Sequence, residues 1–237
     1  MSLSEDIKSD VQGVLDTPWS IRKGQVVPST TNVSLAGGAV ELDATFLYAD
    51  LADSSKMAKE LDRRVAAKIM KSFLATSCRL IKSQGGTIQS FDGDRVMGVF
   101  VGNSKNSDAA RCALHINYVV NDLIKTKFEN KYESVRNASF GIRHGVGVDT
   151  GTVLTVRAGA RGSNDLIWIG RAPNLAAKLS DLRESPHHTF ITASVYNMLS
   201  DRSKYGGQNN ENMWERRNWN FLGDSIRVYR SNWQWAP

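Results

Sequence analysis

Residues 85–100, with the sequence GGTIQSFDGDRVMGVF, contain the clearest hairpin signal in the chain. The two glycines are typical of a helix end, and the runs at 87–91 and 95–100 have the length and composition of strands. An Asp-Gly pair between two such runs favours a tight turn, because both residues tolerate positive φ angles. We therefore predict a β-hairpin in which Asp94 directly follows the turn.

The segments beside this hairpin predict two amphipathic helices. Residues 57–82 place apolar side chains such as Leu61, Val65 and Ile69 at helical spacing. Residues 107–124 repeat the pattern and continue into a charged extension that reaches about residue 133. Each helix therefore has one apolar face to pack on a sheet.

An apolar run at 44–49 has the length of a buried strand and precedes the first helix. Asp50 and Asp53 follow this run. The pair Ser54 and Ser55 then predicts the cap of the long helix, because serine hydroxyls accept hydrogen bonds from the first N–H groups of a helix.

The second half of the chain predicts more strands and two short helices. Pro173 stands at the start of one helix, where proline is well tolerated. The predicted elements are strands at 138–148 and 152–156 around a turn at 149–151, a strand at 166–169, a helix at 174–182, a strand at 189–192, a helix at 193–199, and strands near 214–221 and 225–230. The order strand, helix, strand, strand, helix, strand predicts an α+β fold of the ferredoxin-like βαββαβ type.

Length and composition set the limits of this interpretation. The chain has 237 residues, of which 41% are hydrophobic and 23% charged, which excludes disordered, collagen-like and coiled-coil proteins. Residues 1–40 lack sustained periodicity and are predicted to form an arm, attached to the domain by Trp19. We expect a catalytic domain at 41–231 and a tail at 232–237.

The sequence also predicts the cellular compartment and the kind of partner. The longest apolar stretches are far shorter than a membrane span, and two cysteines are too few for a disulfide framework. No secretory leader is recognisable, so we expect a cytoplasmic protein without a membrane partner. The net charge of +6 favours an anionic partner, which could be a nucleic acid, a membrane surface or a phosphate-bearing small molecule.

Two aspartates could form a metal site in the predicted sheet. Asp50 ends the first strand and Asp94 follows the hairpin turn, and these strands commonly lie side by side in a ferredoxin-like sheet. Convergent carboxylates in an open site suit Mg²⁺ or Mn²⁺, completed by substrate phosphates. Alternatively, each aspartate serves only as a turn or cap residue.

The backbone after Asp50 strengthens the metal hypothesis. If Ser54 or Ser55 caps the helix, the N–H groups of residues 51–55, which include Asp53, form an anion site beside the carboxylates. A metal site next to a phosphate site indicates a nucleoside triphosphate. The alternative is an ordinary serine-capped helix.

At this point the sequence resembles a known family. The stretches FLYADL at 46–51, FDGD at 91–94 and IGRAPNLAAKL at 169–179 are similar to motifs of class III nucleotidyl cyclase catalytic domains, over about 41–231. The resemblance implies a homodimer with active sites at its interface. It also implies two Mn²⁺ or Mg²⁺ ions per site on Asp50 and Asp94, with the carbonyl of Leu51 as a further ligand. The implied reaction is attack of the ribose 3′-hydroxyl on the α-phosphorus with release of pyrophosphate.

The helix motif supplies the implied catalytic pair. Asn174 and Lys178 are one helical turn apart and share a face. They match the family's Asn and Arg, which orient the ribose and stabilise the α-phosphate from the other subunit. Lysine keeps the charge but loses the bidentate fork of arginine, so Arg171 is a candidate to assist.

Other positions depart from the family pattern. The residues that select a purine fall on Ser90 and Ile167, neither of which reads a purine edge in the usual way. Tyr48 replaces the usual Phe, and its larger side chain, which also offers a hydroxyl, favours a pyrimidine-sized base. The lysine that usually holds the terminal phosphates falls on or near Leu222, so the role is unassigned, with Arg217 and Arg227 as conceivable substitutes.

This set of departures resembles the uridylate cyclases of bacterial Pycsar anti-phage systems. The resemblance implies conversion of UTP to cyclic UMP, which activates a separate effector. A cytidylate cyclase, a purine cyclase and a catalytically degenerate nucleotide-binding domain are alternatives. The C-terminal tryptophans could stack on a nucleic acid, but no regular basic residues accompany them, so we expect no nucleic-acid partner.

Overall fold

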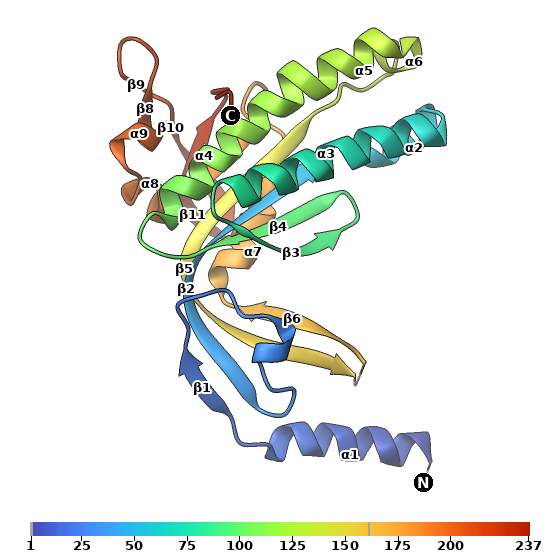
Figure 1. Ribbon diagram of the computed structural model, residues 1–237, viewed down its shortest axis with the longest axis vertical. Coiled ribbons are helices and arrows are strands. Elements are labelled where there is room, and N and C mark those ends of the chain that lie inside the picture. Colours follow the sequence, from blue (N-terminus) through green and yellow to red (C-terminus); the bar gives the residue numbers. More distant parts are fainter. Residues whose placement is uncertain (1, 161) are drawn as a thin grey trace.

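The computed structural model describes residues 2–160 and 162–237. Figure 1 shows a broad sheet with long helices on one side, and an extension in which two strands run on beyond the sheet toward the N-terminal helix. The helices are α1 (Leu3–Asp16), η1 (Thr30–Asn32), α2 (Ser54–Glu60), α3 (Arg63–Ser83), α4 (Lys105–Tyr118), the π-helix η2 (Val119–Lys125), α5 (Thr126–Lys131), α6 (Glu133–Arg136), α7 (Arg171–Ser180), α8 (Ala193–Asn197) and α9 (Asp201–Lys204).

The main sheet has the order β10-β11-β7-β5-β2-β4-β3, with β1 paired to β2 and β6 paired to β5. Its strands are β1 (Ser20–Lys23), β2 (Gly38–Leu51), β3 (Thr87–Asp92), β4 (Arg95–Phe100), β5 (His144–Ala160), β6 (Ser163–Ile169), β7 (Thr189–Thr192), β10 (Glu215–Phe221) and β11 (Asp224–Ser231), and a separate pair contains β8 (Tyr205–Gly206) and β9 (Glu211–Asn212). The central order β5-β2-β4-β3 is that of a ferredoxin-like unit, so the predicted α+β class and the hairpin at 85–100 are confirmed.

The side chains of β2 alternate between two differently packed faces. Leu47, Ala49 and Leu51 point into the large core with α3 and α4, where all three are at most 2% exposed. Phe46 and Tyr48 point to the opposite face, where a smaller cluster contains Ala172 and Ala176 of α7. Asp50 lies two residues after Tyr48 on the same strand and therefore points to the same face. We call these the α3 face and the α7 face of the sheet.

Two glycines of β5 bring α7 close to the sheet. A Cβ atom at Gly147 would overlap the carbonyl oxygen of Ala176, and one at Gly145 would overlap that of Ser180. Gly145 pairs with Asp50, and Gly147 pairs with Tyr48. The absence of side chains at these two positions therefore sets α7 beside the end of β2 that carries the polar residues.

Two details of the sequence prediction are wrong. The segment 138–156 has no turn at 149–151, because β5 runs unbroken from His144 to Ala160 and pairs with β2 along most of that length. Asp149 is 1% exposed and accepts a hydrogen bond from Thr192 at 2.5 Å, so it is an interior strand residue and not a turn residue.

The structure has two helices, α2 and α3, where the sequence predicted one helix at 57–82. Asp53, whose φ is +58°, precedes the short helix α2, but its side chain makes no capping hydrogen bond. The long helix α3 is capped by Asp62, whose side chain accepts from the N–H of Arg64. Ser54 and Ser55 are the first two residues of α2 and cap neither helix. An aspartate before a helix is as good a cap as serine, so the sequence did not discriminate between them.

The N-terminal arm is attached through backbone pairing. β1 pairs in parallel with the start of β2, whereas the side chain of Trp19, expected to hold the arm, is 53% exposed. The helix α1 contains no buried residue. Among residues 2–160 and 162–237, no helix is both long enough and apolar enough to cross a membrane.

Candidate active site

Asp50 and Asp94 meet at one end of the central strands. Asp50 pairs with Arg95 across the β2–β4 ladder, and Asp94 is the residue before Arg95 in the β3–β4 turn. Burial raises the pKa of Asp50, and the negative charge of Asp94 raises it further, while Arg183 and Arg95 oppose the shift. The two carboxylates therefore lie close enough to repel each other.

The donor atoms at this position fit a divalent cation. The Oδ2 atom of Asp94 is buried and has no hydrogen-bond partner, which is costly for a carboxylate unless a cation binds it. Leu51 follows Asp50 at the end of β2, so its backbone lies beside the pair. No three His, Cys, Asp or Glu side chains gather into a metal site anywhere in the described chain, so the pair requires further oxygen ligands such as phosphates.

Arg183 is a site residue that the sequence analysis missed. Its guanidinium donates to Oδ2 of Asp50 at 2.6 Å and to the carbonyl oxygen of Ser180 at 2.5 Å. The residue lies just after α7 and reaches the aspartate because α7 packs on the glycines of β5. No motif marks this position, since only tertiary packing connects it to Asp50.

The segment predicted to bind phosphate is partly occupied by protein contacts. The N–H of Ala52 donates to the carbonyl oxygen of Arg143 at 2.8 Å. Asp53 forms ion pairs with Arg143 at 2.7 Å and Lys56 at 3.3 Å, and the hydrogen bond from Arg143 lowers the pKa of Asp53. Asp53 is therefore an acceptor for these two cations, and Arg143 and Lys56 are the positive groups on this side of the site.

Two residues predicted for the base pocket converge on a third. The Tyr48 hydroxyl donates to Sδ of Met97 at 2.9 Å, and the Ser90 hydroxyl lies 3.7 Å from the same sulfur. The Arg95 guanidinium lies 5.6 Å from the centre of the Tyr48 ring, and burial raises the pKa of Tyr48. Met97 was missed because it stands in an unremarkable strand. The register, which places it opposite both Tyr48 and Ser90, supplies the connection.

The exposed face of α7 carries the predicted catalytic pair. Asn174 and Lys178 are exposed, and Arg171 at the start of the helix is exposed as well. The Lys178 ammonium lies 4.0 Å from Asp181, which in turn lies 3.6 Å from Arg95. These ion pairs link α7 to the end of β4 that carries Asp94. The side-chain amide of Asn174 donates to the carbonyl oxygen of Gly170 at 3.1 Å.

Ile167 lies far from the carboxylates. It pairs with Val156 of β5, which pairs with Ala39 near the start of β2. Eleven residues of extended strand separate Ala39 from Asp50 (50 minus 39), or roughly 35 Å. A single copy of the chain therefore does not bring Ile167 to the site. Its side chain is 45% exposed and faces a cleft beside α1.

The C-terminal hairpin does not present a phosphate ligand at the expected position. Leu222 is 89% exposed at the tip of the β10–β11 turn. Arg217 forms an ion pair with Glu184 at 2.5 Å, so its charge is already balanced. Arg227 is exposed on β11. The assignment of a terminal-phosphate ligand in this region stays open.

Comparisons with known proteins identify the relatives of the chain. No protein-family model matches it. A uridylate cyclase of Rhodovulum sp. (strain MB263) is 57% identical over 237 residues, which cover 100% of this chain and 99% of that protein. A uridylate cyclase of Burkholderia cepacia is 43% identical over 238 residues and is covered completely.

Solved structures support the same fold. A bacterial light-regulated adenylyl cyclase matches 85% of this chain and 55% of that chain with a TM-score of 0.65 and 22% identity. A guanylyl cyclase crystal structure matches 83% of this chain and 95% of that chain with a TM-score of 0.67 and 16% identity. The chain therefore belongs to the uridylate cyclase family, has the class III cyclase fold and is a nucleotidyl cyclase.

Proposed function

We propose that the chain converts UTP to 3′,5′-cyclic UMP and pyrophosphate. The observation that carries the proposal is the buried, unpartnered Oδ2 atom of Asp94 beside Asp50, in a chain 57% identical to a uridylate cyclase. In this reaction the 3′-oxygen forms a bond to the α-phosphorus and loses its proton, while the bond between the α-phosphorus and the bridging oxygen breaks and pyrophosphate leaves.

Asp50, Asp94 and the carbonyl of Leu51 would hold two Mg²⁺ or Mn²⁺ ions. Ions bound there lower the pKa of the 3′-hydroxyl and balance the charge of the phosphates. Arg183 holds one oxygen of Asp50 in place and opposes the rise in the pKa of Asp50 that burial causes. Lys56 and Arg143 add positive charge at the phosphate side.

We assign Asn174 and Lys178 to the ribose and the α-phosphate. Both side chains are exposed on α7, so they can act on substrate held by a second copy of the chain. Arg171 lies on the same helix and supplies a second positive charge. Lysine offers only a point charge to the α-phosphate, and an arginine nearby restores a bidentate donor.

The base pocket proposed for uracil consists of Tyr48, Ser90 and Met97. The sulfur of Met97 engages the Tyr48 hydroxyl, which holds the ring in place at the side of the site. Ser90 is exposed and offers a hydroxyl that donates and accepts, which suits the N3–H and carbonyl groups of uracil. Ile167 would reach this pocket only from a second copy.

A homodimer would complete the site, and α1 is the proposed dimer contact. Leu3, Ile7, Val11 and Val14 recur every three or four residues on α1, and each is at least 53% exposed. An isolated helix of this length is marginal in water, so its apolar stripe requires a partner. Ile167 and Ile169, 45% and 52% exposed, add apolar surface nearby.

Size-exclusion chromatography with light scattering, which measures the mass of the particle, tests the α1 contact. Ile7→Glu, which places a charge in the stripe, is expected to shift the particle toward the monomer mass. Gln12→Glu adds the same charge to the polar side of α1 and is the control. A dimer that resists Ile7→Glu would exclude the helix as its contact.

Product analysis tests the reaction itself. The purified protein is incubated with Mn²⁺ and each of the four ribonucleoside triphosphates, and the product is identified by mass spectrometry. Cyclic UMP from UTP is expected. Mainly cyclic CMP would identify a cytidylate cyclase, and cyclic AMP or cyclic GMP a purine cyclase. No product with any substrate would identify a degenerate nucleotide-binding domain and overturn the proposal.

From the resemblance to anti-phage uridylate cyclases we also propose a role in defence against phage. Cyclic UMP would act in the cytoplasm on a separate effector during phage infection. Phage challenge of cells that carry the cyclase with its effector tests this role. Protection is expected with the intact chain and not with Asp94→Ala, and equal protection by both would separate the defence from nucleotide synthesis.

A further inference from the structure

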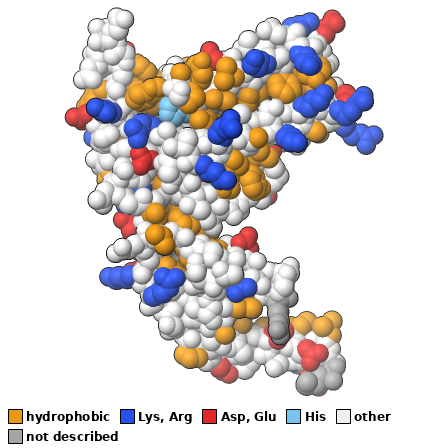
Figure 2. Space-filling view, viewed as in Figure 1, with side chains coloured by type: hydrophobic (Ala, Val, Ile, Leu, Met, Phe, Trp, Pro, Cys, Tyr) orange, Lys and Arg blue, Asp and Glu red, His pale blue; other side chains and the backbone are white. Residues whose placement is uncertain are grey.

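A basic cleft lies between α3 and α5, outside the active site. It has a volume of about 510 Å³ and is lined by four residues of α3, three of α5 and Tyr132, which directly follows α5. Figure 2 shows Lys and Arg side chains around exposed hydrophobic surface at the end of the molecule that carries these helices in Figure 1. Since α3 packs on the α3 face of the sheet, this cleft and the α7 face that holds Asp50 lie on opposite sides.

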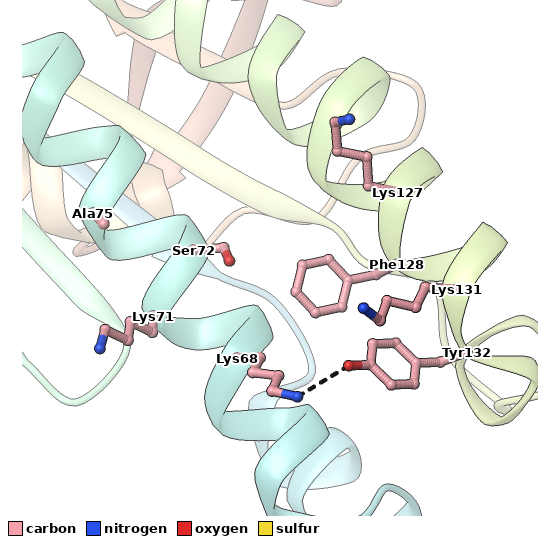
Figure 3. A pocket seen from close by; sticks show the side chains of 8 residues that line it. All are labelled: Lys68, Lys71, Ser72, Ala75, Lys127, Phe128, Lys131 and Tyr132. Carbon is pink, nitrogen blue, oxygen red and sulfur yellow. Dashed lines mark hydrogen bonds between the residues drawn. The ribbon is translucent and has the colours of Figure 1, made fainter.

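Four lysines give the cleft its charge, and none of the described residues that line it is acidic. In Figure 3, Lys68 and Lys131 point into the space between the helices, while Lys71 and Lys127 stand at its edges. Like charges around one cleft repel one another, so a polyanion that binds there relieves an unfavourable interaction. The charge therefore favours a ligand with several phosphates.

Two aromatic side chains, one on α5 and one directly after it, lie between these lysines. Phe128 and Tyr132 are one helical turn apart, with ring centres 5.9 Å apart and planes inclined by 28°. The Tyr132 hydroxyl accepts a hydrogen bond from Lys68 at 3.2 Å, and the ammonium groups of Lys68 and Lys131 lie 5.7 and 5.9 Å from the centre of its ring. Both rings are only partly buried. Flat apolar surface beside positive charge is the combination that binds a nucleobase and its phosphates.

We infer that this cleft binds single-stranded nucleic acid. A single strand exposes its base faces to the rings, whereas a duplex hides them in its stack. The lysines are flexible point charges at the edges of an open groove, as in proteins that follow a phosphate backbone. The groove lacks the backbone N–H cradle, formed by a glycine-rich loop or a helix N-terminus, that usually holds the phosphates of a free nucleotide.

The sequence did not reveal this combination. The expectation of no nucleic-acid partner rested on the C-terminal tryptophans, which have no regular basic neighbours. Lys68 and Lys71 on α3 are separated by about 60 residues from Phe128 on α5 and from Tyr132 directly after it, and only the packing of the two helices places them around one cleft.

Binding of fluorescein-labelled 12-residue oligo(dT) and oligo(rU), measured by anisotropy, tests the inference. A single-stranded ligand in contact with four lysines should show a slope of about −2.8 in log affinity against log salt. Lys68→Gln with Lys131→Gln should weaken binding on the order of tenfold and reduce that slope by about 1.4. Lys8→Gln with Lys23→Gln removes the same charge at the far end of the molecule and is the control.

The aromatic contribution is tested separately, because any basic surface binds a polyanion weakly. Phe128→Leu with Tyr132→Leu should weaken binding at least about fivefold, and Tyr132→Phe, which keeps the ring, should not. Photocrosslinking of a 5-iodouridine oligonucleotide should label Phe128 or Tyr132, as read by mass spectrometry of the peptides.

Three results would overturn the inference. The first is the absence of oligonucleotide binding. The second is an equal loss of affinity in the cleft variant and in the control variant with the two distant lysines replaced. The third is tighter binding of UTP or a duplex than of the single strand. Cyclase activity without oligonucleotide should be the same in the lysine variants and the unmodified chain, so failure of this inference is distinguishable from failure of the proposed reaction.

Discussion

The two faces of the central sheet treat buried ionisable groups in opposite ways. On the α3 face, His144 is fully buried, and neither ring nitrogen has a hydrogen-bond partner. Burial lowers the pKa of His144 well below its usual value, and the nearby charges of His188 and Arg183 act in the same direction. The side chain is therefore held neutral, with the centre of the Phe73 ring of α3 at 6.5 Å and that of the stacked ring of His188 at 5.0 Å.

On the α7 face, the acidic side chain Asp50 is paired with positively charged side chains. Asp50 has an arginine at 2.6 Å, a second carboxylate beside it and a single helix covering part of the surface. His144 and Asp50 both stand at the end of the β2–β5 ladder, where Asp50 pairs with Gly145 and Leu51 with His144. Asp50 and His144 belong to neighbouring residue pairs of the ladder and therefore lie on opposite faces of the sheet. On one face the buried group is neutral, and on the other it is paired with opposite charge.

Removal of a carboxylate from the α7 face should produce the largest effect. Asp94→Ala and Asp50→Ala are expected to lower kcat about 1,000-fold or more, or about 4 kcal/mol, because each removes the ligand on which the proposed ions depend. Circular dichroism and particle mass should be unchanged. Asp224→Ala, which removes an exposed carboxylate at the β10–β11 turn, is the control and should retain most activity. Near-normal turnover in Asp94→Ala would remove this residue from the site.

The contrast between the faces was only partly predictable from the sequence. The hairpin at 85–100 and the amphipathic helices were found because turn chemistry and periodicity are local properties. Asp50 and Asp94 were predicted to lie together for the same reason, since both stand next to a predictable strand end, and the structure places them side by side. Their role as metal ligands stays a prediction. The continuous strand β5 was not predicted, because the Asp149-Thr150-Gly151 turn signal is overridden by pairing with β2 and by the hydrogen bond that Asp149 accepts from Thr192.

The residues that complete the site are set by tertiary structure. Arg183 and Met97 carry no motif and reach Asp50 and Tyr48 through helix packing and strand register. Gly145 and Gly147 could be read from the sequence only as unusual residues within a strand. Their function, which is to let α7 approach, is visible once the helix lies on them.

The next largest effect should come from separating α7 from the sheet. Gly147→Ala places a Cβ against the backbone of Ala176 and Ser180, so α7 must shift, at a cost of about 3 kcal/mol in the free energy of unfolding. Gly151→Ala, on the same strand and face, meets only the Cβ of Ala172 at 3.7 Å and is the control. Urea denaturation measures both. Equal stability of the two variants would mean that α7 is not fixed by these glycines.

The smallest effect concerns the neutral histidine on the α3 face. Because the pKa of His144 is lowered in the folded protein, the unfolded chain binds a proton below about pH 6.5 that the folded chain does not. Stability should therefore fall as pH falls, by about 1.4 kcal/mol from this residue between pH 7.5 and 5.5. The pKa values of His115 and His188 are lowered too, mainly by burial, and add dependence of the same sign.

His144→Phe isolates this contribution, because phenylalanine fills a similar space beside Phe73 and does not titrate. At constant protein concentration, urea denaturation of His144→Phe should lose about 1.4 kcal/mol less than the unmodified chain over that pH interval. Parallel pH profiles for the two proteins would show that the histidine is protonated in the folded state. The α3 face would then tolerate charge, and the difference between the two faces would rest on the α7 residues alone.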